Sequence, residues 1–180
     1  MVDADCVRQA QQGDRTAIVR LLREVENSVY KTAYYMLGNE HDALDCTQEA
    51  LLRIYHRIAS FKGESRFETW VQRIVTNICI DHRRRSKKTL PLEEEIGSSD
   101  PASRHKVEWS GVASDLRSAI KRLPEHQRTA VVLRYVHGYR YDEIAESMNL
   151  PLNTVKSHLF RGRKNLQAWL VDYQEGGVIP

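Results

Sequence analysis

A basic stretch near the C-terminal end is the part of this sequence best suited to chemistry with DNA. No Asp or Glu interrupts residues 154–164, while basic, polar and aromatic side chains surround an apolar stripe at helical spacing. Such side chains hydrogen-bond to base edges and pair with phosphates, so a helix here is expected to bind DNA. The expected contact residues are Thr154, Lys156, Ser157, His158, Phe160, Arg161, Arg163 and Lys164.

Two helical patterns separated by a short turn position these residues. Residues 142–148 form a short amphipathic pattern, which Pro151 prevents from continuing because it disfavours a helical Leu150. In the second pattern Gly162 lies on the buried side, where a partner backbone can approach closely. The rest of that side consists of Val155, Leu159, Leu166 and Leu170. We predict a helix-turn-helix, whose second helix presents its first turn to bases; two ordinary surface helices with solvated basic residues are the alternative.

Three more helices are predicted in the first ninety residues. The first covers residues 14–37 and ends at Gly38-Asn39, and the second covers residues 41–59. The inward side of the second is expected to consist of Ala43, Leu44, Ala50, Leu51, Ile54, Tyr55 and Ile58. Its outer side carries a polar stripe of Asp45, Gln48, Glu49 and Arg53.

The third helix is predicted to begin at a capping box formed by Ser65 and Glu68. Its core side is expected to contain Phe67, Trp70, Val71, Ile74, Val75 and Ile78. More exposed positions are expected to be Gln72, Arg73, Thr76, Asn77, Asp81 and His82, followed by Arg83-Arg84-Arg85. Aromatic residues beside amides and arginines suit unstacked bases, although Trp70 by itself is more often a core residue.

Residues 86–114 lose the helical periodicity and contain prolines, glycine and three consecutive glutamates at 93–95. The net charge of +3 is unevenly distributed, because residues 91–115 carry 2 Lys and Arg against 6 Asp and Glu. Beyond them, Leu116–Leu123 and a helix from Pro124 to Tyr135 precede the helix-turn-helix. We therefore predict an all-α protein with one small helical domain at 1–86, a flexible acidic linker at 87–114 and a second domain at 115–180.

The remaining composition excludes several classes of protein. Cys6, Cys46 and Cys79 have no paired spacing, so neither a disulfide framework nor a zinc site is indicated, and a reducing cytoplasm fits best. No stretch approaches the ~18 apolar residues of a membrane span, and the start has no signal-peptide pattern. We expect no cofactor, no metal and no small-molecule substrate.

Several of these motifs, in this order, resemble the extracytoplasmic-function class of bacterial sigma factors. The resemblance covers about Asp14 to Leu170. Residues 42–49 resemble the helix that docks on the polymerase clamp helices. Residues 61–70 with Arg73, Ile74 and Asn77 resemble the segment that melts and reads the minus-ten element. Residues 123–128, 141–145 and 153–157 resemble the domain that reads the minus-thirty-five element.

The resemblance implies a transcription initiation factor without catalysis, whose partners are core RNA polymerase, promoter DNA and an anti-sigma factor, often membrane-bound. It implies core binding by Asp45, Gln48, Glu49 and Arg53. It implies minus-ten contacts by Arg66, Thr69, Trp70, Arg73, Asn77, Arg83 and Arg84, with Asn77 holding a flipped non-template base. The residues of the basic stretch at 154–164 would read the minus-thirty-five element, and Glu93–Glu95 would imitate phosphates inside the polymerase.

Two positions depart from the family pattern. Arg140 stands where Ser often caps the first helix of the helix-turn-helix, so the N-cap is expected to be missing or moved to Asp142. Asn153 stands where Gly is common, and Asn tolerates a left-handed backbone.

Two other functions remain open from the sequence. A stand-alone helix-turn-helix regulator would bind an operator as a dimer, but it leaves the first ninety residues without a role. A nuclease holding a metal at Glu93–Glu95 or at Asp81-His82 is the second, although no clustered metal-ligand spacing supports it.

Overall fold

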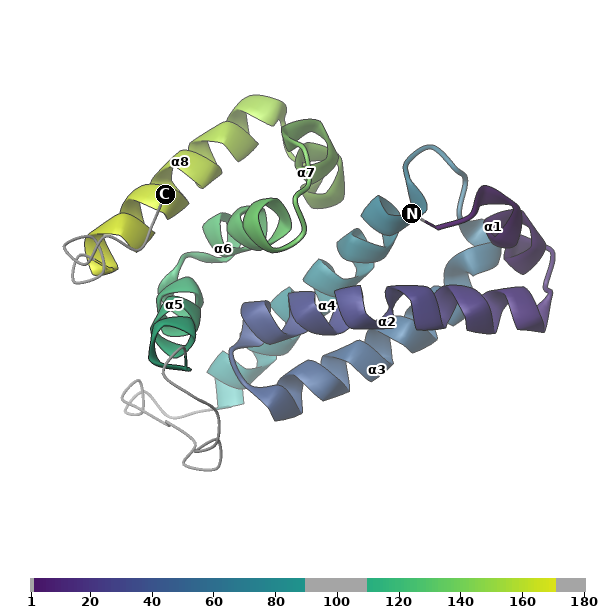
Figure 1. Cartoon of the computed structure of the whole chain (residues 1–180), viewed down its shortest axis with the longest axis horizontal. Helices are drawn as coiled ribbons and strands as arrows, with labels where there is room; N and C mark the ends of the chain where they lie inside the picture. The colour runs from purple at the N-terminus through teal and green to yellow at the C-terminus, as the bar shows by residue number, and fades with distance from the viewer. Residues whose placement is uncertain (1, 90–109, 171–180) are drawn as a thin grey trace.

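The computed structural model describes residues 2–89 and 110–170, within which every regular element is a helix. The first group is α1 (Ala4–Gln11), α2 (Arg15–Leu37), α3 (Glu40–Arg57), a short 3-10 helix η1 (Ile58–Ser60) and α4 (Phe67–Thr89). The second group is α5 (Ser110–Arg122), α6 (Glu125–Val131), a π-helical turn η2 (Val132–Val136), α7 (Tyr141–Met148) and α8 (Leu152–Trp169). The predicted all-α class is confirmed, and we call the two groups the N-terminal and C-terminal domains (Figure 1).

The N-terminal domain is built on the antiparallel pair α2 and α3 (Figure 1). The Asp14 carboxylate accepts from the amides at the start of α2, and Gly38 ends that helix with a left-handed φ of 79°. Asn39 then caps α3 directly, so the reversal takes two residues. Helix α4 packs on both, and its buried side contains Phe67, Val71, Ile74, Val75 and Ile78, as predicted.

Helix α1 was not predicted. It is only eight residues long, and its buried residues Cys6, Val7 and Ala10 pack on the first half of α2. Asp3 caps it, and the Gln11 side-chain amide donates to the carbonyl of Phe61 at 2.5 Å. Helix α1 therefore ties the start of α2 to the loop that precedes α4.

Several local predictions for the N-terminal domain were wrong. Leu44 and Tyr55 are exposed, whereas Gln72 and Thr76 are buried. The capping box does not form between the described residues Ser65 and Glu68. Instead, the Ser65 hydroxyl donates to the Arg66 carbonyl, and Glu68 accepts from the amide of Val2.

The helices also extend into the predicted linker. Helix α4 continues to Thr89 and α5 begins at Ser110. Glu93, Glu94 and Glu95 lie outside the described residues, so their expected role stays a prediction.

The C-terminal domain contains the predicted helix-turn-helix, formed by α7 and α8. Val155 and Leu159 are buried against α6 and α7, while Leu166 is partly buried. Gly162 is buried where α8 crosses α6, and a Cβ placed there would lie 2.9 Å from Cγ2 of Val131. The close approach expected at Gly162 is therefore confirmed.

The turn of this motif differs from the prediction in two details. Asn149, with φ 52° and ψ 46°, is the left-handed residue, whereas Asn153 belongs to the first turn of α8. The N-cap position is Arg140 and has not moved to Asp142. The Glu143 carboxylate accepts from the Arg140 amide at 2.8 Å and so satisfies one of the free amides of that helix end.

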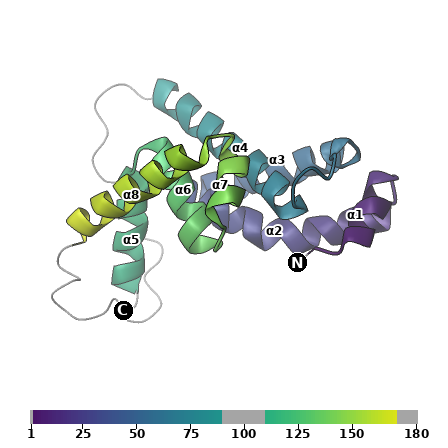
Figure 2. The same cartoon turned by 90° about the horizontal axis from the view of Figure 1, so that it is seen from above.

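The two domains pack against each other along one side of α2 and α4 (Figures 1 and 2). Helix α7 contacts α4, while α5 and η2 contact α2. Ile120 and Val132 of the C-terminal domain belong to the same buried cluster as the N-terminal core. The described chain is therefore folded back on itself, with the helix-turn-helix beside α4.

Candidate nucleic-acid interface

Helix α8 presents the basic surface expected to bind DNA. Lys156, Ser157, Phe160, Arg161, Arg163 and Lys164 are exposed, and Thr154 and His158 are partly buried. In the described part of the chain, none of these cations has a carboxylate within ion-pair distance. The helix thus offers phosphates an uncompensated positive surface, and Phe160, 60% exposed, suits contact with a thymine methyl.

His158 lies beside a second histidine that the sequence did not single out. The rings of His158 and His126 of α6 are 5.4 Å apart, and Nδ1 of His158 is a buried atom without a hydrogen-bond partner. Burial, and then the neighbouring His126 and Arg161, lower the pKa of His158. The neutral ring is therefore favoured beside the residues expected to read DNA.

Helix α4 exposes only part of the predicted minus-ten set. Arg73 and Asn77 are exposed one turn apart, where an amide and a guanidinium can reach one strand. Trp70 is half-buried and packs against Phe61 and Phe67, with ring centroids 5.2 and 5.7 Å away. Thr69 is buried, so its hydroxyl does not reach the surface in this conformation.

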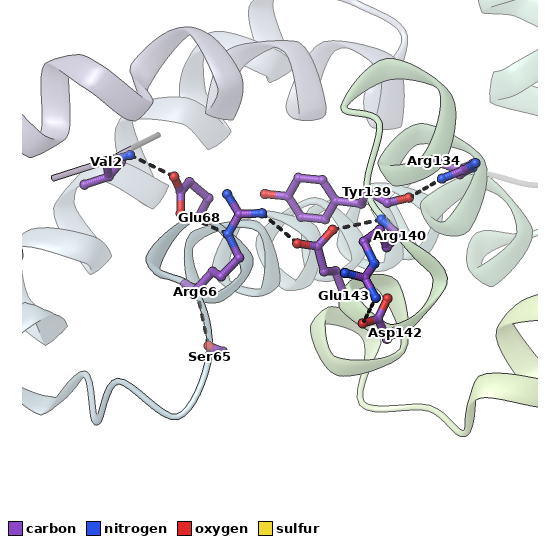
Figure 3. A network of polar contacts seen from close by, with 9 residues as sticks. All are labelled: Val2, Ser65, Arg66, Glu68, Arg134, Tyr139, Arg140, Asp142 and Glu143. Carbon is purple, nitrogen blue, oxygen red and sulfur yellow. Dashed lines mark hydrogen bonds and ion pairs between the residues drawn. The ribbon is translucent and has the colours of Figure 1, made fainter. Parts of the chain in front are cut away.

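Arg66 takes part in a polar network between the domains (Figure 3). Its Nη1 lies 2.8 Å from Oε1 of Glu143 in α7, and its Nε lies 4.0 Å from Glu68. The other oxygen of Glu143 accepts from the Arg140 amide, as described above. Glu143 therefore both caps its own helix and holds an arginine of the opposite domain.

The arginines at the other end of α4 make similar contacts. Arg84 pairs with Glu125 of α6 at 2.9 Å, and the Arg83 guanidinium donates to the carbonyl of Lys121 at 3.4 Å. Three of the predicted minus-ten arginines thus contact the C-terminal domain. The sequence did not indicate the two carboxylates that pair with Arg66 and Arg84, namely Glu143 and Glu125, because they belong to a different domain.

Hydrogen bonds join α2 and α4 to His137, the residue that follows η2. His137 Nε2 lies 2.7 Å from the Thr32 hydroxyl, which in turn donates to Gln72 at 2.6 Å. Gln72 donates to Ser28 at 2.8 Å. Burial, and then the nearby Lys31, lower the pKa of His137 to about 4, so the ring is neutral at neutral pH.

Arg128 makes a second buried link between the domains. Its side chain is only 1% exposed and donates to four backbone carbonyls. Three of these carbonyls, those of Ile120, Lys121 and Leu123, belong to the end of α5 and the residue after it. The guanidinium nitrogens lie 3.0 Å from the Ile120 oxygen and 2.8 Å from the Leu123 oxygen, and one also donates to Lys121. The fourth, 2.8 Å away, is Met36 in the last turn of α2. One cation therefore satisfies the carboxyl ends of two helices.

The polar stripe of α3 lies on the exposed side of the N-terminal domain. Asp45 and Gln48 are exposed, while Glu49 and Arg53 are partly exposed and paired at 2.5 Å. The predicted stripe is interleaved with apolar residues that sequence reasoning missed or placed inside, namely Leu44, Leu52 and Tyr55. Leu52, 60% exposed, shows that this side of α3 is partly apolar.

The Asp81-His82 metal site of the nuclease alternative would lie within the described residues. No group of three or more His, Cys, Asp or Glu could hold a metal ion there. Asp81 is exposed, and His82 lies 3.6 Å from Asp42, which makes a pair and not a metal cluster. None of the described helices is long and apolar enough to span a membrane. The three cysteines are buried and free.

Comparisons with known families match both domains. The model for Sigma-70 region 2 matches residues 21–89, and that for Sigma-70, region 4 matches residues 113–166. Among solved structures, the sigma factor RpoE from Bartonella quintana, in complex with the anti-sigma factor NepR, has TM-score 0.69 at 22% identity, covering 84% of this chain and 94% of that one. CnrH, in complex with the cytosolic domain of CnrY, has TM-score 0.72 at 20% identity, covering 93% and 96%. These two similarities concern the fold alone.

Curated relatives match along nearly the whole chain. The ECF RNA polymerase sigma factor SigW of Bacillus subtilis is 33% identical over 178 residues, covering 92% of this chain and 95% of its own. The ECF RNA polymerase sigma-E factor of Escherichia coli is 32% identical over 180 residues, covering 91% and 92%. With both sigma regions matched and the helix-turn-helix and α4 surfaces in place, the chain belongs to the extracytoplasmic-function (ECF) family of RNA polymerase sigma factors.

Proposed function

We propose that this alternative sigma factor docks on core RNA polymerase through the outer side of α3 and grips one promoter with α4 and α8. As a member of its family it directs the polymerase to promoters, and we assign it no catalysis of its own. The observation that carries the proposal is the separation of three exposed surfaces on three helices, one mixed polar and apolar and two basic. Each surface suits a different partner.

The α3 surface suits a protein partner. Asp45, Gln48, Glu49 and Arg53 can pair with charged side chains of the polymerase clamp helices, which gives orientation and selectivity. Leu44, Leu52 and Tyr55 between them add apolar area, and interfaces of this mixed kind have an apolar core with a polar rim. We therefore add these three residues to the core-binding set.

The α4 and α8 surfaces suit DNA in two states. Asn77 and Arg73 of α4 would hold an unstacked base and its backbone, with Arg66, Arg83 and Arg84 on flanking phosphates. Thr154, Lys156, Ser157 and His158 of α8 would meet base edges of the minus-thirty-five duplex. Arg161, Arg163 and Lys164 would meet phosphates.

The packing of the two domains supports weak DNA binding by the free chain. Arg66 and Arg84 already have carboxylate partners in the opposite domain, and Gln72 and Thr69 are buried. Docking on the polymerase would have to separate the domains before α4 and α8 can reach two promoter elements at once. An anti-sigma factor, such as the one bound to RpoE in the similar solved complex, would bind the same surfaces and hold this chain inactive.

Reconstitution with purified core polymerase tests the proposal. The wild-type chain should form a holoenzyme that initiates at specific promoters in run-off transcription. Gln48→Ala with Glu49→Ala, and separately Leu52→Ala, should reduce core binding, whereas Ser157→Ala in α8 should leave it unchanged. Tight binding of a free dimer to duplex DNA without polymerase would instead favour a stand-alone regulator, and failure to associate with the core would refute the proposal.

A further inference from the structure

The start of α2 carries three arginines that the proposed function does not use. Arg15, Arg20 and Arg23, which we call the arginine stripe, are exposed on the outer side of the helix. With Thr16 and Val19 they line a shallow, open depression on this side of the helix. Within the described residues, none of the three has a carboxylate at ion-pair distance.

The surroundings of the stripe neutralise it only in part. Residues 15–23 contain no Asp or Glu, and neither do residues 50–63, which contain Arg53, Arg57 and Lys62. Because α2 and α3 run antiparallel, the first half of α2 lies beside the second half of α3 (Figure 1). Asp14, on one side of the stripe, is engaged as the N-cap of α2, and on the other side the exposed Glu24 and Glu26 offset part of the positive charge, which the six cations of these two segments outnumber. This end of the domain therefore has a positive potential that favours an anion.

The stripe also lies at the same end of the domain as the segment expected to hold the opened strand. Gln11, four residues before Arg15, donates to the Phe61 carbonyl, and α1 packs on both α2 and η1. Phe61 begins the segment that leads through Arg66 into α4. A strand that leaves α4 over its N-terminal end would therefore pass close to the start of α2.

We propose that the arginine stripe binds phosphates of single-stranded DNA where the opened strand continues beyond α4. This inference rests on the proposed minus-ten role of α4. Arg15 and Arg23 are ~12 Å apart along the helix at ~1.5 Å per residue, and phosphates recur every ~3.4 Å along a stacked strand, so about three or four nucleotides span the stripe. Guanidinium groups bind phosphate oxygens in pairs of hydrogen bonds.

An acidic protein surface is the competing partner for the stripe. The cores of protein interfaces are rich in aromatic and apolar side chains. The apolar residue between these arginines is Val19, and no aromatic side chain lines the depression. The composition of the stripe therefore favours a phosphate backbone.

Holoenzyme binding to forked promoter DNA tests the inference. Three forked DNAs are compared, each at several salt concentrations. In one the non-template strand ends at the minus-ten element, and in the other two it extends by about six nucleotides on the upstream or on the downstream side. One of the two extensions should strengthen wild-type binding about tenfold or more. It should also steepen the slope of log affinity against log salt concentration by about 2, since each of about three single-strand phosphate contacts contributes about 0.7. The triple variant Arg15→Gln, Arg20→Gln, Arg23→Gln should lose both effects.

The controls separate this inference from the proposed function. Gln and Arg have similar helix propensities, so the variant should keep its helical circular dichroism. Arg8→Gln removes a cation from α1 at the same end of the domain, where Asp5 already pairs with it, and should leave the extension effect intact. An unchanged extension effect in the triple variant, or a loss of core affinity in it, would overturn the inference. A wild-type holoenzyme that ignores even the unextended fork would overturn the proposed function as well.

Discussion

Nη1 of Arg66 in α4 lies 2.8 Å from Oε1 of Glu143 in α7, so an arginine expected to hold promoter DNA is paired with the helix-turn-helix of the other domain. Arg66 is 54% exposed, so the pair contributes less than about 1 kcal/mol. Its importance is positional, because the carboxylate occupies the place that a DNA phosphate is proposed to take. The same holds for Arg84 and Glu125 at the opposite end of α4.

Glu143→Gln should release Arg66 and strengthen binding of single-stranded minus-ten DNA to the free chain. The effect should be at most about fivefold, because a partly exposed pair contributes less than about 1 kcal/mol. Asp142→Asn is the matched control, since Asp142 pairs with Arg140 of its own domain. Fluorescence anisotropy with a labelled single strand measures the difference. Equal affinity of both variants would show that the pair does not compete with DNA.

Acidification should destabilise the chain through His137. Its pKa falls from 6.5 in the unfolded chain to about 4 in the folded one, so the stabilisation is complete above pH 6.5 and is lost as the pH falls toward 4. Between pH 7 and pH 4.5 the wild type should lose about 2 to 3 kcal/mol more unfolding free energy than His137→Gln, which keeps a hydrogen-bonding side chain. Urea unfolding at several pH values measures this. Parallel pH profiles would contradict it.

Arg128→Lys should be strongly destabilising although it preserves the charge. An ammonium group has three donors at one point and cannot reach carbonyls at the ends of both α5 and α2. Leaving several buried carbonyls unpaired should cost about 3 kcal/mol or more. Arg134→Lys is the control, because Arg134 is partly exposed and, besides its contact with the Tyr141 ring, donates to the backbone carbonyl of Tyr139. Arg134→Lys should cost less than about 1 kcal/mol, and a similar loss in both variants would remove the special role of Arg128.

The helices themselves follow from local sequence signals. Asp14, Gly38 and Asn39 mark the ends of α2 and the start of α3 by side-chain and backbone chemistry that needs no distant partner. The helix-turn-helix likewise follows from Pro151 and the stripe through Val155 and Leu159. These features involve residues close together in sequence, which is why periodicity and capping rules predict them.

The errors arise where distant contacts decide the environment. Gln72 belongs to a polar position of α4, but hydrogen bonds to Thr32 and Ser28 of α2 bury it. Tyr55 is aromatic and has the helical spacing of the buried residues of α3, yet its side chain remains exposed on the outer side of that helix. Glu68, whose spacing fits a capping box, accepts instead from Val2 of a segment that was not predicted to fold. Neither periodicity nor spacing within one helix contains this information.

Substitutions in the two helices proposed to bind DNA should impair different steps of initiation. Lys156→Ala in α8 should weaken binding of the holoenzyme to duplex minus-thirty-five DNA by about 1 to 3 kcal/mol and reduce its discrimination between minus-thirty-five sequences, because a base contact is lost. Asn77→Ala in α4 should leave that binding unchanged but impair strand opening, seen as reduced permanganate reactivity of unpaired thymines. If both variants fail in the same step, α4 and α8 do not have separate roles.

Gly162→Ala should destabilise the C-terminal domain, although alanine usually stabilises a helix by about 0.5 to 1 kcal/mol relative to glycine. The new Cβ would meet Cγ2 of Val131 at 2.9 Å, and this buried β-branched side chain has no other favourable rotamer within a helix. Overpacking of about 1 to 3 kcal/mol should exceed the gain in helix propensity. A double-mutant cycle with Val131→Ala tests the cause, because Gly162→Ala should cost less, or stabilise, once the methyl groups are gone. Equal effects of Gly162→Ala in both backgrounds would show that α6 and α8 are not held at this distance by the glycine.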